Sequence, residues 1–390
     1  MATYNTNEFK AGLKVMLDGV DVHRTSTIPP SRLPQGEKGA SRCVLRTHLV
    51  ISERAMIPGT SVLRQVPVWQ SALARAISDP AELLAAVGLG DEWLPAATAA
   101  ARLFPLRVPR GFVARMRPRD PRDPLLRQVL PLAEESLAVE GFGADPVGDL
   151  SAMVVPGVLH KYHGRVLLTA TGACAVHCRY CFRRHFPYAE ANPVVDQWRQ
   201  ALDYIACDDS ITEVILSGGD PLSLSDRRLA DLARRLEAIP HLRRLRLHTR
   251  LPIVLPERVN EELRDWLGAT RLKTAVVVHA NHANEIDAGV MAALAGLKAS
   301  GAELLNQSVL LRGVNDSTEA LMALSEKLFE AGVLPYYLHL LDKVQGAAHF
   351  EVEEAAARRL MTELNRQLPG YLVPRLVREI PGAPGKVWLT

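Results

Sequence analysis

The stretch Cys174-Ala-Val-His-Cys178-Arg-Tyr-Cys181 is the part of this 390-residue sequence that decides the fold class. It places three of the chain's five cysteines in the spacing C-x3-C-x2-C, directly after a β-rich run at 166–170. Three thiolates from one loop can bind three irons of a 4Fe-4S cluster and leave the fourth iron open to chelate a small ligand. A reactive loop at the end of a strand is typical of α/β enzymes built from βα units.

A structural zinc site is the alternative for this loop, with His177 or His185 as the fourth ligand. We favour iron-sulfur because zinc ligands usually come in pairs from two knuckles, whereas all of these ligands would come from one loop. Cys43 and Cys207 lie outside the motif and are interpreted as ordinary thiols. A sparse, odd number of cysteines also argues against a disulfide framework.

Short β-rich runs continue after the cysteine loop and alternate with amphipathic helical stretches such as 226–239 and 290–299. After the first interval the runs start about 30 residues apart, which is the rhythm of βα units. Six such units predict an α/β fold with a parallel sheet curled into a partial (β/α)6 barrel. The six runs are 166–170, 213–216, 245–248, 274–279, 304–311 and 336–341.

Polar residues follow most of these runs. They are Ser217-Gly218-Gly219-Asp220, His248-Thr249-Arg250, His279, Asn281 and Asp342. Because the carboxyl ends of parallel strands lie on one rim of such a barrel, we expect these residues to meet there.

The chain before the barrel divides into two parts. Residues 1–50 are predicted to be an irregular extension, because the stretch 25–41 is rich in Pro, Ser, Gly and Arg and has no periodic pattern of apolar residues. Residues 51–155 predict a helical N-terminal region, with Asp79 capping a helix that begins at Pro80. The barrel itself is expected over 156–390.

The composition argues against several classes of protein. Hydrophobic residues make up 48% and charged residues 23% of the chain, so it is not a disordered or fibrous sequence. The net charge of +3, without interleaved aromatic and basic residues, argues against direct nucleic-acid binding. The sequence has neither a long apolar run nor a secretory signal, which predicts a cytoplasmic protein with no membrane partner.

The spacing C-x3-C-x-aromatic-C resembles the signature of radical S-adenosylmethionine (SAM) enzymes. The resemblance implies that the open iron binds the amino and carboxylate groups of SAM, and that one electron cleaves SAM to a 5′-deoxyadenosyl radical. The segment Ser217-Gly218-Gly219-Asp220-Pro221 resembles the family's SAM-contacting GGDP segment. The same resemblance assigns His248 and Gln307 to the SAM site.

Further segments are similar to lysine 2,3-aminomutases, over about residues 69–386. They are 181–185, 279–285, 306–311 and 335–342. Three more resemble the branch that makes (R)-β-lysine for elongation factor P, and they are 159–163, 182–188 and 341–350. The implied activity is an isomerase that converts L-α-lysine to (R)-β-lysine.

This resemblance implies pyridoxal phosphate as a second cofactor. Lys386, at the end of a Gly-Pro loop, stands where the family has the pyridoxal lysine, and Lys161, Tyr162 and Arg165 align with its phosphate-contacting segment. The family continues Lys-Thr-Pro after the pyridoxal lysine, whereas this chain reads Val-Trp-Leu and ends at Thr390, so we expect a shorter, altered tail.

The resemblance also implies a substrate site. Arg183 aligns with the arginine that grips the substrate carboxylate, for which a planar guanidinium is suited. Asp342 and Glu379 align with two acids that hold the ε-ammonium group of lysine. The free-lysine enzymes have Asp at the position of Glu379, so this residue departs from the pattern.

The implied partners are free L-lysine, a flavodoxin- or ferredoxin-like electron donor, and elongation factor P with its β-lysine ligase. An aminomutase for free-lysine catabolism or for another amino acid is the alternative within this chemistry. A zinc-stabilised binding protein is the alternative without catalysis.

Residues 1–19 resemble the N-terminus of elongation factor P itself. A fragment of this length cannot form the factor's barrel domain. We interpret it as a mis-assigned start or a gene-boundary fusion in preference to a functional docking arm.

Overall fold

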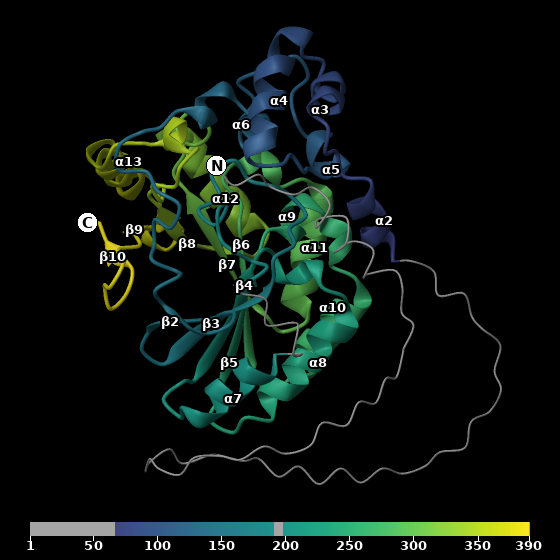
Figure 1. Cartoon of the computed structure of the whole chain (residues 1–390), viewed down its shortest axis with the longest axis vertical. Coiled ribbons are helices and arrows are strands. Elements are labelled where there is room, and N and C mark those ends of the chain that lie inside the picture. The colour runs from purple at the N-terminus through teal and green to yellow at the C-terminus, as the bar shows by residue number, and fades with distance from the viewer. Residues whose placement is uncertain (1–66, 191–197, 390) are drawn as a thin grey trace, which may run out of the picture. The chain divides into compact units, whose positions relative to one another are not determined.

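The computed structural model describes residues 67–190 and 198–389, and its centre is one ten-stranded sheet in the order β1 to β10 (Figure 1). The six predicted strands are confirmed, and they run parallel in sequence order. They are β3 (Arg165–Thr171), β4 (Glu213–Gly218), β5 (Arg244–Thr249), β6 (Lys273–Val278), β7 (Glu303–Val309) and β8 (Leu334–His339). The sheet is mixed and does not close, as expected for a partial barrel.

Four strands extend this sheet beyond the prediction. β1 (Met153–Val155) and β2 (Val158–Tyr162) pair antiparallel ahead of β3. β9 (Arg375–Arg378) is parallel to β8, and β10 (Val387–Trp388) is antiparallel to β9. These strands have two to five residues each, too few to show a period of two in the sequence.

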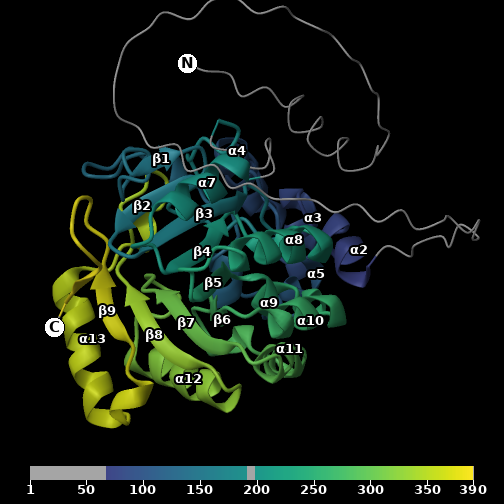
Figure 2. The same cartoon turned by 90° about the horizontal axis from the view of Figure 1, so that it is seen from below.

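Helices line the outer side of the curved sheet, where the strand connections run (Figure 2). The two predicted helices are confirmed as α8 (Asp226–Glu237) and α11 (Ala288–Ala299). Their companions are α7 (Arg199–Cys207), α9 (Leu251–Val254), α10 (Glu261–Ala269), α12 (Thr318–Glu330) and α13 (Glu354–Gln367). In the part of the chain that the structure describes, no helix is both long and apolar enough to cross a membrane.

The strand register decides which side chains face the helices and which face the site. Leu216 of β4 is paired with Leu247 of β5, and both are buried in one core cluster with helix residues such as Leu229. Successive residues of a strand point to opposite faces of a sheet. Ser217 and His248, the next residues along these strands, therefore lie on the other face.

The region before the sheet is helical, with the helices grouped in Figure 1 beside one end of the sheet. They are α2 (Val68–Ala74), α3 (Pro80–Val87), α4 (Leu94–Leu103), α5 (Arg110–Val113) and α6 (Pro124–Arg127). The Asp79 side chain accepts a hydrogen bond from the Ala81 amide (3.0 Å), which confirms the predicted cap. Leu83 and Phe112 belong to the same core cluster as β4, so these helices pack directly on the barrel.

The domain boundaries remain predictions. β1 lies at the end of the segment 51–155 that the sequence predicts as helical. The predicted extension 1–50, its likeness to elongation factor P and Cys43 lie outside the described residues.

Candidate functional site

One cavity of about 480 Å³ opens at the carboxyl ends of the parallel strands, and every candidate site residue predicted from the sequence lines it. These residues are Lys161, Tyr162, Arg165, Cys174, Cys178, Cys181, Arg183, Ser217, Gly218, Gly219, Asp220, His248, Gln307, Asp342, Glu379 and Lys386. They come from positions more than 200 residues apart in the chain, from Lys161 to Lys386. The structure therefore brings the predicted set together, while the role of each residue stays a prediction.

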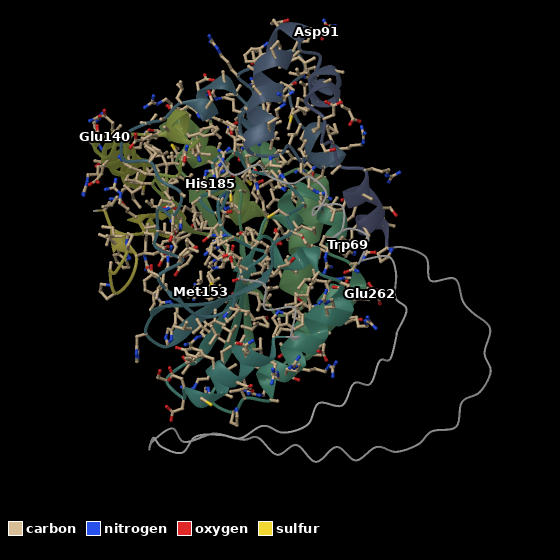
Figure 3. All side chains as sticks on the ribbon, viewed as in Figure 1. Trp69, Asp91, Glu140, Met153, His185 and Glu262 are labelled. Carbon is tan, nitrogen blue, oxygen red and sulfur yellow. The ribbon has the colours of Figure 1, made fainter. Side chains whose placement is uncertain are left out.

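The cysteine loop follows β3 and presents its three half-buried thiols to this cavity. Burial raises the pKa of Cys174 and, with the neighbouring thiol of Cys178, raises the pKa of Cys181 to about 11. The free thiols of Cys174 and Cys181 are therefore protonated at neutral pH. Thiolate ligands form when cationic iron replaces those protons, so loading of a cluster releases protons. His185, labelled in Figure 3, lies four residues after Cys181.

The thiol arrangement suits a cluster better than a single ion. Over 67–190 and 198–389, no group of three or more His, Cys, Asp or Glu side chains is placed to hold one metal ion. In a 4Fe-4S cluster each thiolate binds a different iron, so the three thiols need not meet at one ion.

The segment after β4 packs tightly against the start of the cysteine loop. Gly218 has a φ of +107°, and a Cβ atom on Gly219 would lie 2.4 Å from the carbonyl oxygen of Ala173. Larger residues would push the two segments apart. These glycines thus place the predicted SAM segment directly beside the first cysteine.

Asp220 in this segment has its carboxylate fully engaged by the protein. Oδ1 accepts from the hydroxyl of Thr249 (2.7 Å) and the amide of Leu222 (3.0 Å), and Oδ2 from the amides of Arg250 (2.7 Å) and Leu251 (3.1 Å). Burial raises the pKa of Asp220 to about 6 against these hydrogen bonds. The side chain ties the end of β4 to the end of β5 and orders the rim.

His248 on β5 offers an unused polar atom beside the cavity. Burial lowers the pKa of its imidazole well below the usual value, so the ring is neutral. Its Nε2 is buried and has no hydrogen-bond partner among the described residues. A buried polar atom without a partner is costly, which favours a ligand that bonds to it. His248 therefore fits the predicted SAM site.

The cavity also contains a chain of alternating charges. The Lys386 ammonium contacts the Glu379 carboxylate at 2.7 Å, and Glu379 also contacts Lys161 at 3.0 Å. Lys161 contacts Asp149 at 2.6 Å, and Asp149 accepts from Nε of Arg183 at 2.6 Å. We call these five residues the ion chain. It links the predicted pyridoxal lysine to the predicted substrate arginine.

The two acids within the ion chain are held as carboxylates. Burial would raise the pKa of Asp149, but the charges of Arg183 and Lys161 outweigh burial and lower it. In the same way Lys386 and Lys161 outweigh burial at Glu379 and lower its pKa. Each acid lies between two cations, which together compensate its negative charge.

Asp342 differs from both. Burial and the nearby Glu379 charge raise the pKa of Asp342 to about 7. Within the described residues its carboxylate has no hydrogen bond or ion pair of its own. Glu379, by contrast, already contacts two lysines. Asp342 is thus the predicted substrate acid that has room for an added ammonium group.

The residues also fit a phosphorylated cofactor. Arg165 lies over the ring of Tyr162, 4.7 Å from its centroid, and Lys161 and Lys386 add two ammonium groups to the lining of the same cavity. A phosphate group needs such cations, and the ammonium of Lys386 lies inside the cavity.

Comparisons with known proteins identify the family. The radical SAM superfamily profile matches residues 168–324, which contain the cysteine loop and most of the parallel strands. The chain is 50% identical to L-lysine 2,3-aminomutase of Haemophilus influenzae over 331 residues, which cover 85% of this chain and 98% of that protein. It belongs to the lysine 2,3-aminomutase family.

Other relatives agree. L-lysine 2,3-aminomutase of Escherichia coli is 52% identical over 82% of this chain and 93% of its own length. The Clostridium subterminale protein of that name is 36% identical over 70% of this chain and 66% of its own length. The chain is therefore an isomerase, and lysine as its substrate is consistent with these relatives. The family implies a 4Fe-4S cluster, SAM and pyridoxal phosphate as its cofactors. The non-catalytic zinc alternative is wrong.

Sequence reasoning missed two residues of this aminomutase site. Asp149 stands in an irregular segment before β1, where neither strand rhythm nor resemblance drew attention to it. Arg250 was noted only as a polar residue on the rim. Asp149-Leu150 follows Asp145-Pro146, a turn signal that marks a loop but does not show that its carboxylate is buried.

Proposed function

We propose that this aminomutase supplies (R)-β-lysine for the modification of elongation factor P. The observation that carries the proposal is that one cavity contains both the three thiols of the cysteine loop and the ion chain that ends at Lys386. The branch-specific segments 159–163, 182–188 and 341–350 support elongation factor P as the destination of the product. Such a role would place the enzyme in the cytoplasm, where translation takes place.

In this proposal the thiolates of Cys174, Cys178 and Cys181 hold the cluster, and the segment Ser217 to Asp220 with His248 and Gln307 binds SAM. A flavodoxin- or ferredoxin-like protein donates the electron. When bound, these cofactors supply a carbon radical, and pyridoxal phosphate supplies a conjugated ring that stabilises the unpaired electron.

The remaining residues orient lysine. Lys386 carries the pyridoxal group, and Lys161, Tyr162 and Arg165 hold its phosphate. Nε of Arg183 bonds to Asp149 and its Nη1 donates to the Ser217 hydroxyl at 3.3 Å, so Arg183 binds the substrate carboxylate through Nη2. Asp342 with Glu379 attracts the ε-ammonium group. Fixing both ends of lysine aligns its β-carbon with the radical source. Cofactors and lysine that fill the cavity exclude the water that would quench the radical.

An anaerobic assay tests the proposal. Reconstituted protein is given SAM, pyridoxal phosphate, a reductant and L-lysine, and the product is separated by chiral chromatography beside a Lys386→Ala control. We expect (R)-β-lysine from the native chain only. The product is then offered with the β-lysine ligase to elongation factor P, whose mass should rise by one lysyl residue. Turnover of another amino acid in place of lysine would contradict the substrate assignment.

A further inference from the structure

Arg250 follows β5 on the cavity rim and contacts the cysteine loop directly. Its Nη1 donates to the Sγ atom of Cys178 at 2.8 Å and to the hydroxyl of Tyr180 at 2.6 Å. The side chain is only 6% exposed, so water does not compete for these contacts. Neither sequence reasoning nor the family comparison gives this residue a role.

Buried partners from other elements hold the guanidinium in place. Its Nη2 donates to Glu285 at 2.9 Å and to the side-chain oxygen of Gln128 at 2.6 Å. Asn281 donates to the same Gln128 oxygen (2.9 Å) and to the Tyr180 hydroxyl (2.7 Å). Tyr180 belongs to the cysteine loop, Gln128 follows α6, and Glu285 ends the short helix Ala283–Glu285 after β6. Three segments of the fold therefore fix the position of Arg250.

The charges around Arg250 are arranged in order from the cysteine loop inwards. The cation lies at the sulfur of Cys178, and the compensating carboxylate of Glu285 lies behind it. A positive charge and an N–H donor at a ligand sulfur stabilise the cluster state that carries more negative charge. In a buried site this effect is stronger than it would be in water.

We propose that Arg250 tunes the redox potential of the cluster, by donating a hydrogen bond to the Cys178 sulfur and so stabilising the reduced state. One electron from a low-potential donor adds one negative charge to the cluster. No bond of Arg250 forms or breaks, and its protons stay on the guanidinium. This inference goes beyond the proposed function, and rests on Cys178 being a cluster ligand.

The test is an anaerobic redox titration of the reconstituted holoprotein, without lysine, followed by electron paramagnetic resonance of the reduced cluster. We compare the native chain with Arg250→Gln and Arg250→Lys. For Arg250→Gln we expect the ratio of reduced to oxidised cluster at a fixed potential to fall about tenfold, which is about 59 mV for one electron. Arg250→Lys keeps the charge but cannot bond to both Cys178 and Glu285, so we expect a smaller shift in the same direction.

The matched control is Arg244→Gln, at the other end of the same strand, where the side chain bonds to Thr212. It removes the same charge far from the rim and should leave the potential unchanged. Arg250→Gln leaves Glu285 buried without its cation, which destabilises the fold. A second variant, Arg250→Gln/Glu285→Gln, therefore removes both charges together. We expect the double variant to show the lower potential as well.

Circular dichroism and iron content establish that each variant is folded and loaded before its potential is compared. Folded, loaded Arg250 variants with the native potential would overturn the redox role and leave the proposed function intact. A native chain that forms no cluster under the same conditions would overturn both. The potential is measured without turnover, so a failed lysine assay cannot imitate either result.

Discussion

Two parts of the cavity, the cysteine loop with the residues behind it and the ion chain, are built on different principles. At the cysteine loop, the polar groups behind the loop satisfy one another, as Asp220 does with two amides on one oxygen and Arg250 does between Gln128 and Glu285. At the ion chain, charged groups alternate, and Asp342 is left without a partner of its own among the described residues. Around the cysteine loop the hydrogen bonds hold the side chains in one arrangement, whereas a charged ligand can change the pairing of the groups in the ion chain.

This difference matches what each part of the cavity is proposed to bind. A cluster and SAM need ligands held in one geometry, and saturated hydrogen bonds supply that. A substrate that enters with its own charges must find cations and anions that can change partners. The ion chain offers Arg183 and Lys386 at its two ends for that purpose.

The largest expected effect separates the two parts completely. Cys178→Ala should abolish the cluster's visible absorbance, SAM cleavage and β-lysine formation, because one of three ligands is lost. Lys386→Ala should abolish β-lysine formation while the cluster forms normally. Absorbance, 5′-deoxyadenosine release and chiral product analysis measure these outcomes. A Lys386→Ala protein that cannot assemble its cluster would show that the two parts are not independent.

Removal of a buried charge behind the cysteine loop tests how fixed that part is. Glu135 is fully buried and contacts Arg179 at 2.6 Å and Arg184 at 2.8 Å. Glu135→Gln leaves both guanidinium groups without their anion, and we expect the free energy of unfolding to fall by about 3–5 kcal/mol. Chemical denaturation measures it. Glu303→Gln, at a carboxylate 77% exposed, is the control and should leave the unfolding midpoint in place.

Asp149→Asn tests the ion chain at its centre. The variant removes the only charge between Lys161 and Arg183 in the chain of contacts, so Arg183 should turn from its predicted orientation toward the substrate carboxylate. We expect kcat/KM for lysine to fall by about 10- to 100-fold, or about 1.4–2.8 kcal/mol. SAM cleavage without lysine should be unaffected. An equal loss in both assays would show that Asp149 supports the whole fold rather than substrate binding.

The smallest expected effect is a pH dependence that originates at Asp342. Its pKa is raised to about 7, and only the ionised carboxylate attracts the substrate ammonium. kcat/KM for lysine, which reports the free enzyme, should therefore rise as the pH increases through about 7 and level off above it. Asp342→Asn should be weaker at high pH and should lose this rise. A rise of the same size in Asp342→Asn would assign the titration to another group.

Much of this could be predicted because the relevant signals are local. The C-x3-C-x2-C spacing, the β-rich runs and the turn after each run depend on neighbouring residues, so the three cysteines, all six parallel strands and the polar residues after them were expected. The resemblance added residues that no periodic pattern would single out, which are Lys161, Tyr162, Arg165, Arg183, Gln307, Glu379 and Lys386. The short strands β1, β2, β9 and β10 were missed because pairing with neighbours, rather than their own period, makes them strands.

What only the tertiary structure decided is which charged groups meet. Glu379 is 218 residues from Lys161, and each of Asp149, Lys161 and Glu379 alone has the pattern of an ordinary surface charge. Burial at one cavity lowers the pKa of Asp149 and Glu379 and raises that of Asp342, since the balance between lost water and nearby cations differs at each position. The sequence by itself determined the chemistry that the cysteine loop can support, because ligand spacing is covalent. The partners of Arg250 and Asp149 depend on distances across the fold, and folding alone sets those.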